Sequence, residues 1–119
     1  LPIPVTSNHA YVHLRNGSKI LTKRAKDWMM EAERIAKRDA KEQHWTLEET
    51  RKVVVEVLTY WPDRRTRDCH NGSKLIMDAL EGIVYKDDKR ALVRYMDYEV
   101  DKENPRVELK IYLKEDEEK

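Results

Sequence analysis

Cysteine is almost absent from this chain. Its single cysteine, Cys69, excludes a disulfide within the chain and favours a reducing, cytoplasmic environment. Cys69 stands beside His70, but a zinc site needs more ligands, and the other three histidines lack ligand spacing. We therefore interpret Cys69 as a small, partly buried thiol.

Apolar runs long enough to span a membrane are also absent, and neither a signal peptide nor an internal repeat is visible. At 119 residues the chain is long enough for one domain and too short for two. Charged and hydrophobic residues each make up 39% of it, so the core is lean and dimerisation would add useful burial. We expect one folded domain over residues 1–114 and a disordered acidic tail over 115–119.

A strong excess of positive charge is absent too, because the formal net charge is only +1. This total hides an uneven distribution, since acidic residues collect in the tail and basic residues gather between positions 64 and 94. The basic residues are Arg64, Arg65, Arg67, Lys86, Lys89, Arg90 and Arg94. The total charge does not indicate a nucleic-acid binder, but its distribution favours an anionic partner.

The side chains that can perform chemistry gather within residues 61–90. Asp68 and His70 lie between an apolar run and an amphipathic helix, so both can point at one place from a strand-to-helix turn. Asp87 and Asp88 follow a second turn downstream. A carboxylate, an imidazole and a distant acidic pair that converge would suit a divalent cation, and oxygen-rich sites favour Mg²⁺ or Mn²⁺.

Helical geometry decides which residues of the next helix face this place. Asn71, Lys74 and Asp78 fall on one arc at about 100° per residue, opposite the apolar side chains. Lys74 would stabilise the negative charge that builds on phosphorus in a transition state. Each residue alone is weak evidence for a functional site, because acidic pairs and surface lysines are common in solvated turns and helices. Since an acidic site needs positive charge to approach phosphates, we favour phosphate contact over solubility for the basic residues.

The order and spacing of these residues resemble a known family. The matching segments are PDRRTRDCHNGSK (62–74), DAL (78–80) and YKDD (85–88), preceded by LPIP (1–4) and SNHAY (7–11). Together they are similar to the signature of the RusA-type Holliday junction resolvases, the crossover junction endodeoxyribonucleases. The resemblance covers most of the chain.

The resemblance implies a homodimeric endonuclease that binds four-way DNA junctions and nicks two strands symmetrically with Mg²⁺ or Mn²⁺. It implies no small-molecule cofactor and no membrane. Asp68 and Asp88 are then the main metal ligands. His70 completes the metal shell, with Asp87 as an optional assisting ligand.

The remaining site residues are expected to support the metal and the DNA. Lys74 stabilises the pentavalent phosphorus or the leaving oxygen, while Asn71 and Asp78 orient the turn and Lys74 rather than contact the metal. Expected DNA contacts are Asn8, Arg15, Arg64, Arg65, Arg67, Lys86, Lys89 and Arg90. Because phosphate contacts are largely blind to sequence, the spacing of two sites across the dimer would select the junction.

The chain departs from the family pattern at His70, where the family has a second aspartate. An imidazole removes a negative charge from the metal shell, which weakens Mg²⁺ and favours Mn²⁺ or another metal with nitrogen affinity. Two alternatives therefore stay open, a branched-DNA binder that does not cut and a dimer that regulates a partner. Because Asp68, Asn71, Lys74 and Asp88 are present, we favour retained catalysis.

The periodicity predicts an α+β fold, with a mixed sheet backed by two helices. Residues 1–21 are predicted as extended, with Asn16-Gly17 as a hairpin turn. Thr22 is a suitable N-cap for a long amphipathic helix that runs to about Gln43. Thr46 is predicted to cap a short helical turn.

Residues 52–61 have the strongest strand pattern. Their nearly continuous apolarity predicts a central strand, and the site would then lie at the end of a rigid support. Residues 92–100 and 106–113 are predicted as two further strands, which we expect to pair as a hairpin through the connection 101–105.

Overall fold

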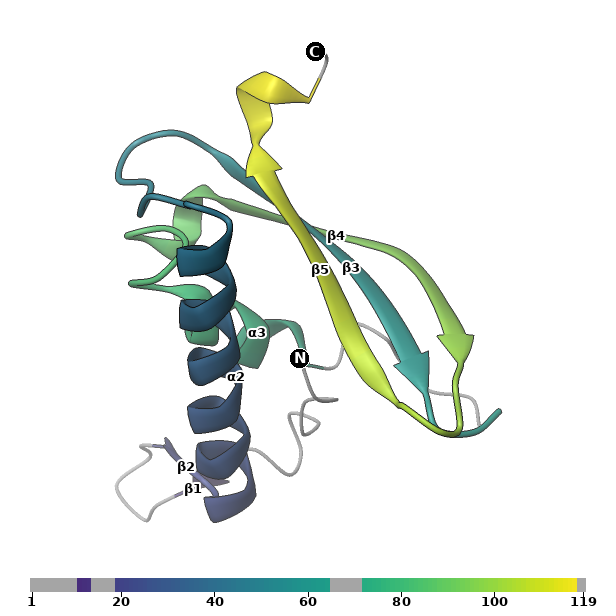
Figure 1. Ribbon diagram of the computed structural model, residues 1–119. Coiled ribbons are helices and arrows are strands. Elements are labelled where there is room, and N and C mark those ends of the chain that lie inside the picture. Colours follow the sequence, from purple (N-terminus) through teal and green to yellow (C-terminus); the bar gives the residue numbers. More distant parts are fainter. Residues whose placement is uncertain (1–10, 14–18, 65–71, 118–119) are drawn as a thin grey trace.

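The computed structural model describes residues 11–13, 19–64 and 72–117, with side chains from residue 22 onward (Figure 1). Strand β1 (Tyr11–His13) pairs antiparallel with β2 (Lys19–Leu21), and His13 stands opposite Lys19. The predicted Asn16-Gly17 turn lies outside the described residues. The strands on either side of it pair as the predicted hairpin requires.

Helix α2 (Lys23–Glu42) begins and ends within a residue of its predicted bounds. The Thr22 hydroxyl accepts a hydrogen bond from the Ala25 N–H at 3.3 Å, which confirms Thr22 as the N-cap. Ala25, Trp28 and Ala32 are buried, whereas the side of the helix that carries Met30 faces solvent. None of the described helices has the length and apolarity needed to cross a membrane.

Strand β3 (Val53–Trp61) is the centre of a mixed sheet that has three strands within the described residues, in the order β4-β3-β5. Strand β4 (Ala91–Val100) runs parallel to β3, and β5 (Arg106–Leu113) runs antiparallel to it. The valines of β3 are fully buried. The predicted central strand is therefore confirmed.

The predicted hairpin between the last two strands is wrong, because β4 and β5 lie on opposite edges of β3. Their connection crosses the end of β3, where the Asp101 N–H donates to the Trp61 carbonyl at 2.8 Å. A strand as apolar as β3 is buried, and its backbone groups then need hydrogen-bonding partners along both edges. A local hairpin would have left one edge of β3 without them.

Helices α2 and α3 (Ser73–Leu80) cover the same face of the sheet (Figure 1). The core between the layers joins the apolar face of α2, Val53, Val55 and Val57 of β3 and the apolar face of α3. Helix α3 also supplies the crossover that the parallel strands β3 and β4 require. The α+β architecture with two helices behind a mixed sheet is thus confirmed.

Residues 46–51 form no helical turn, so the predicted capping role of Thr46 is wrong. Instead, Glu48 forms a β-bridge with Tyr85. The Glu48 carboxylate accepts hydrogen bonds from the backbone N–H groups of Thr50 and Arg51 and from the Arg51 guanidinium. The hydrogen bonds hold a bend over residues 49–51, and the bridge to Tyr85 links the segment before β3 to the segment before β4.

The acidic end packs against the sheet as far as residue 117. Lys114–Asp116 form the short 3-10 helix η2, and Glu117 forms ion pairs with Arg94 and Lys114. These ion pairs place Glu117 beside β4, and the expected disorder of the acidic tail over residues 115–119 stays a prediction. Arg94, which we had grouped with the basic residues around the site, therefore interacts with the tail.

Candidate functional site

Helix α3 presents one apolar and one polar face, as its periodicity predicts. Leu75, Ile76 and Leu80 are at most 2% exposed on the core side. On the opposite arc, Lys74 is exposed and Asp78 is half-buried. The helix thus directs an ammonium and a carboxylate away from the core.

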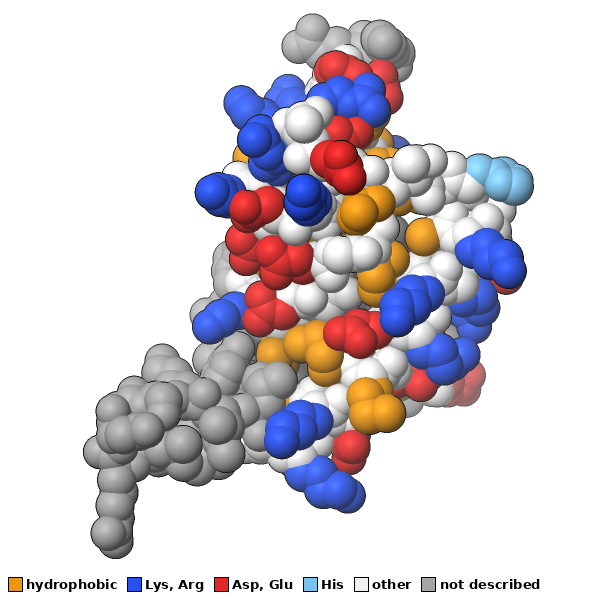
Figure 2. All heavy atoms as spheres, turned by 90° about the vertical axis from the view of Figure 1, so that its left-hand side faces the viewer, with side chains coloured by type: hydrophobic (Ala, Val, Ile, Leu, Met, Phe, Trp, Pro, Cys, Tyr) orange, Lys and Arg blue, Asp and Glu red, His pale blue; other side chains and the backbone are white. Residues whose placement is uncertain are grey.

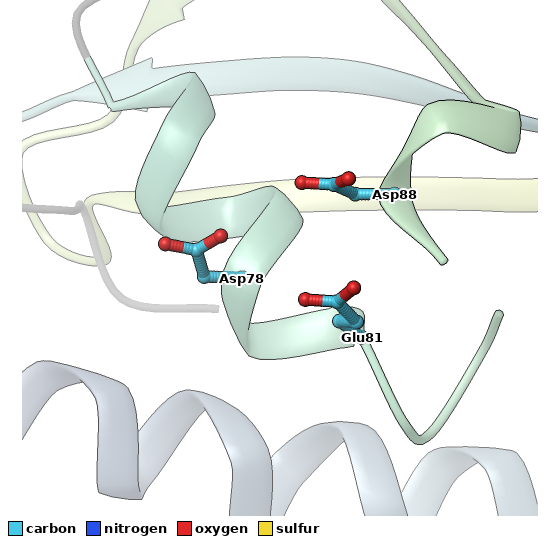
Figure 3. A group of neighbouring side chains, drawn as sticks. All are labelled: Asp78, Glu81 and Asp88. Carbon is cyan, nitrogen blue, oxygen red and sulfur yellow. The ribbon is translucent and has the colours of Figure 1, made fainter. Parts of the chain in front are cut away.

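Three carboxylates, from Asp78, Glu81 and Asp88, meet beside this polar face, and we call them the acidic cluster. One oxygen from each lies within 4.8 Å of an oxygen from each of the others. Asp78 belongs to α3, Glu81 is the residue at its C-terminal end, and Asp88 opens the 3-10 helix η1 (Asp88–Arg90). Figure 3 shows the three carboxyl groups around a common space between α3 and η1.

The tight turn after α3 returns the chain so that Asp88 lies beside the helix. Gly82 has a φ of 85°, a left-handed conformation that favours glycine, and its N–H donates to the Tyr85 carbonyl at 2.8 Å. The Tyr85 ring is buried, and its hydroxyl donates to the Met77 carbonyl at 2.6 Å. Tyr85 therefore fixes the turn to the last turn of α3, and through it the position of Asp88.

The electrostatics of the acidic cluster follow from burial and from the proximity of like charges. Burial raises the pKa of Asp78, Lys74 lowers it, and the charge of Asp88 raises it further. The pKa of the Tyr85 hydroxyl is raised first by burial and then by the charges of Asp88, Glu81 and Asp78. A cation placed among the carboxylates would relieve this concentration of negative charge.

Asp87 has a different role from its neighbour Asp88. Its carboxylate accepts a hydrogen bond from the Lys89 N–H at 3.0 Å and lies 3.5 Å from the Lys89 ammonium. The backbone hydrogen bond is the main reason why the pKa of Asp87 is lowered. Asp87 thus caps η1 and stands apart from the acidic cluster.

Several predicted site residues fall outside the described part of the chain. They are Asn8, Arg15, Arg65, Arg67, Asp68, His70 and Asn71. Asp68 and Asp88 therefore remain a predicted ligand pair. Asp78 lies with Asp88 in the acidic cluster, although we had assigned it only an orienting role. We did not anticipate Glu81, although its position three residues after Asp78 on a helical path was a usable signal.

The described basic residues near the site are exposed, and two of them make local contacts. Arg64, Lys86, Lys89 and Arg90 are all exposed. Arg90 donates to the Thr50 carbonyl at 2.7 Å, and Lys89 pairs with Asp87. Figure 2 shows blue and red side chains intermixed over one face of the molecule, in agreement with the small net charge.

The donor set of the acidic cluster fits a hard divalent cation. Carboxylate oxygens are preferred ligands of Mg²⁺, which holds them at about 2.0–2.1 Å, so opposite oxygens lie about 4 Å apart. Only one pair among three ligands can be opposite, and neighbouring ligand oxygens lie about 3 Å apart, so the cluster oxygens, which lie within 4.8 Å of one another, would have to move closer around a bound cation. Asp78, Glu81 and Asp88 can therefore hold such a cation, next to an exposed lysine on the same helix.

Comparison with known proteins agrees with this chemistry. A comparison with curated proteins found no match. A family model described as endodeoxyribonuclease RusA matches residues 2–112, from before β1 into β5. Because the match spans nearly the whole chain, the chain belongs to the RusA family of endodeoxyribonucleases, which resolve Holliday junctions.

Proposed function

We propose that this protein cuts four-way DNA junctions by hydrolysing phosphodiester bonds, with Mg²⁺ or Mn²⁺ and as a homodimer that makes paired nicks. One observation carries the proposal: Asp88 lies among the carboxylates of α3, beside the polar arc that bears Lys74, in a member of an endodeoxyribonuclease family. A nuclease needs this combination of clustered oxygen ligands and a nearby cation.

Asp88 is the central metal ligand in this proposal, and Asp68 joins it from the segment before α3. Asp78 and Glu81 already lie with Asp88 and complete or support the ligand set. When bound, the cation supplies polarisation of the phosphate and a water of lowered pKa. His70 adds a nitrogen ligand, which would make Mn²⁺ a suitable alternative to Mg²⁺.

Lys74 acts on the substrate rather than on the metal. It is exposed on the same arc as Asp78, and its charge already lowers the pKa of that carboxyl group. A phosphate held at the acidic cluster would lie within reach of this ammonium. Lys74 would then stabilise the additional negative charge of the transition state.

The exposed basic residues around the turn guide the DNA backbone to the site. Arg64, Lys86 and Arg90 are suited to phosphate contacts, which compensate for the repulsion between DNA and the acidic cluster. Such contacts do not read sequence. Selection of a junction would come from two sites held at a fixed separation in the dimer.

A second function is favoured by His70, which stands where the family has an aspartate. Fewer negative charges could leave a protein that binds branched DNA or regulates a partner without cutting. The same arginines and the same dimer would serve both of these roles.

Incubation of the purified protein with a four-way junction and Mg²⁺ or Mn²⁺ separates these functions. Paired symmetric nicks, resolved on a denaturing gel, support the proposed resolvase. A shifted but intact junction on a native gel indicates a binder that does not cut. If neither nicks nor a shifted band is seen, even at high protein concentration, both DNA roles are contradicted.

A further inference from the structure

The turn of residues 83–90, which carries Asp88, is held by two parts of the chain. The Tyr85 hydroxyl fixes it to α3. The other part is residues 45–50, between the end of α2 and β3, which we call the support segment (Figure 1). The support segment contacts the turn both before and after Asp88, so it can set the position of that carboxylate.

Before Asp88, the contacts meet at the Val84 carbonyl. The indole N–H of Trp45 donates to this oxygen at 2.9 Å, and the Glu48 N–H donates to it at 3.0 Å. A carbonyl oxygen has two lone pairs, so both are used. The Glu48 carbonyl in turn accepts a hydrogen bond from the Lys86 N–H at 2.9 Å. Three hydrogen bonds therefore fix the backbone just before the two aspartates of the turn.

After Asp88, the contact is made by a side chain. The Arg90 guanidinium donates to the Thr50 carbonyl at 2.7 Å. A guanidinium has five N–H donors, so this hydrogen bond leaves others for a phosphate. Asp88 thus lies between two attachments, at Lys86 and at Arg90, to the same support segment.

The end of α2 places Trp45 for its contact. The Trp45 N–H donates to the Ala40 carbonyl at 2.8 Å, and the His44 N–H donates to the Lys41 carbonyl at 3.2 Å. His44 has a φ of 57°, which completes the Schellman motif at the end of the helix. The Trp45 ring is half-buried and packs against the core. A fixed chain reversal and a packed ring together direct the indole N–H toward the turn.

We propose that the support segment positions Asp88 for the metal, with Trp45 as the positioning residue. The proposal rests on the proposed function, because it takes Asp88 as a metal ligand. Trp45 acts through the backbone of the turn and contacts neither the metal nor the DNA. Loss of its N–H leaves the buried Val84 carbonyl with one partner fewer, and the turn can then shift Asp88 relative to the other two carboxylates of the acidic cluster. Loss of a group that orients a metal ligand costs about 10–100-fold in metal affinity.

Trp45→Phe tests the proposal by two measurements, because it keeps an aromatic ring and removes the N–H. Hydrogen exchange of the Lys86 amide, followed by NMR without metal, should accelerate at least about tenfold relative to the Val55 amide in β3. Mn²⁺ affinity, measured by EPR without DNA, should fall by about 10–100-fold. Saturating Mn²⁺ should restore most of the junction cutting, because Trp45 takes no part in the chemistry.

Tyr112→Phe is the matched control for the loss of a hydrogen bond. It also keeps its ring, and it removes the hydroxyl that donates to the Glu56 carboxylate at 2.6 Å within the sheet. We expect the relative exchange of the Lys86 amide and the Mn²⁺ affinity of this variant to equal those of wild type.

A pair of substitutions at His44 tests the placement of Trp45 without changing the indole. His44→Gly and His44→Val remove the same exposed imidazole, but only glycine adopts a φ of 57° freely, whereas a β-branched side chain is strained there. The His44→Gly variant should bind Mn²⁺ like wild type. The His44→Val variant should bind it at least about threefold more weakly. This pair decides the question if Trp45→Phe does not fold.

The outcomes separate the support segment from the proposed function. Wild-type Lys86 exchange and Mn²⁺ affinity in Trp45→Phe, or an equal loss of affinity in Tyr112→Phe, would overturn the positioning role and leave the nuclease proposal intact. Equal affinities of the two His44 variants would also overturn it. A wild type that binds no Mn²⁺ contradicts the proposed metal site and the positioning role together. A wild type that binds Mn²⁺ and cuts no junction contradicts only the nuclease proposal.

Discussion

Glu48 and the acidic cluster show two contrasting environments for carboxylates in the same fold. Glu48 is 8% exposed and accepts hydrogen bonds from two backbone N–H groups and from Arg51. These partners hold the pKa of Glu48 at about 2, far below its ordinary value. In the acidic cluster, by contrast, three carboxylates approach one another, and burial together with Asp88 raises the pKa of Asp78.

The difference indicates a division between structure and function. A carboxylate whose negative charge is balanced by hydrogen-bond donors stabilises the fold and has little capacity left to bind a ligand. Carboxylates held close together against their mutual repulsion have that capacity, and burial of Tyr85 beneath them keeps them in place. Perturbed groups of this second kind are characteristic of functional sites.

Removal of one carboxylate from the acidic cluster should have the largest effect on activity. Asp88→Asn removes the charge of the central proposed ligand, and we expect junction cutting to fall by at least about 100-fold while junction binding is retained. The matched control is Asp87→Asn, which lies next to it but caps η1, and an amide can also cap. Cleavage rates and native-gel affinities measure both effects. Wild-type cutting by Asp88→Asn would disprove the ligand assignment.

Replacement of His70 by a carboxylate should shift metal preference. His70→Asp restores the residue of the family pattern, and we expect the ratio of Mg²⁺-supported to Mn²⁺-supported cutting to rise by about tenfold. Titration of each metal in the cleavage assay measures this ratio. An unchanged ratio would mean that His70 does not contact the metal.

Loss of the charge at Glu48 should reduce stability and leave the site intact. Because the folded pKa of Glu48 is about 2 and therefore lowered, its contribution is fully present above about pH 4.5 and declines as the pH falls toward 2. Glu48→Gln should therefore unfold more easily than wild type at pH 7, and the difference should shrink in acid. Urea unfolding at several pH values tests this, with the exposed neighbour variant Glu49→Gln as the control. A difference independent of pH would show that charge is not the cause.

The smallest effect is expected at the support beneath the cluster. Tyr85→Phe keeps the buried ring but removes the hydroxyl that donates to the Met77 carbonyl, which should cost about 0.5–1.5 kcal/mol of unfolding free energy. Thermal unfolding measures the loss, with Tyr98→Phe on exposed β4 as the control. A cutting rate that falls far more than the stability would show that the hydroxyl positions Asp88 rather than merely stabilising the fold.

Local patterns were sufficient for the elements that depend on neighbouring residues. Thr22 and the apolar repeat that follows it predicted α2, and the run of valines predicted the central strand. The polar arc of α3, with Lys74 and Asp78, also followed from helical periodicity. In each case the signal lies within a few turns of one element, where geometry alone decides which side chains share a face.

Contacts between distant segments could not be predicted in this way. The positions of β4 and β5 depend on which edge of β3 each one reaches, and the two strands are locally compatible with a hairpin. The helical turn predicted after Thr46 was wrong because Glu48 forms a bridge with Tyr85, which lies 37 positions further along the chain.

The sequence by itself determined the family pattern, the long capped helix, the buried central strand and the polar face of α3, because these depend on residue type and short-range periodicity. Only the tertiary structure decided that Asp78, Glu81 and Asp88 share one space and that β3 has a neighbour on each edge. These features depend on how the chain reverses at Gly82 and crosses the end of β3. Such reversals place distant residues together through packing and hydrogen bonds, which no local pattern encodes.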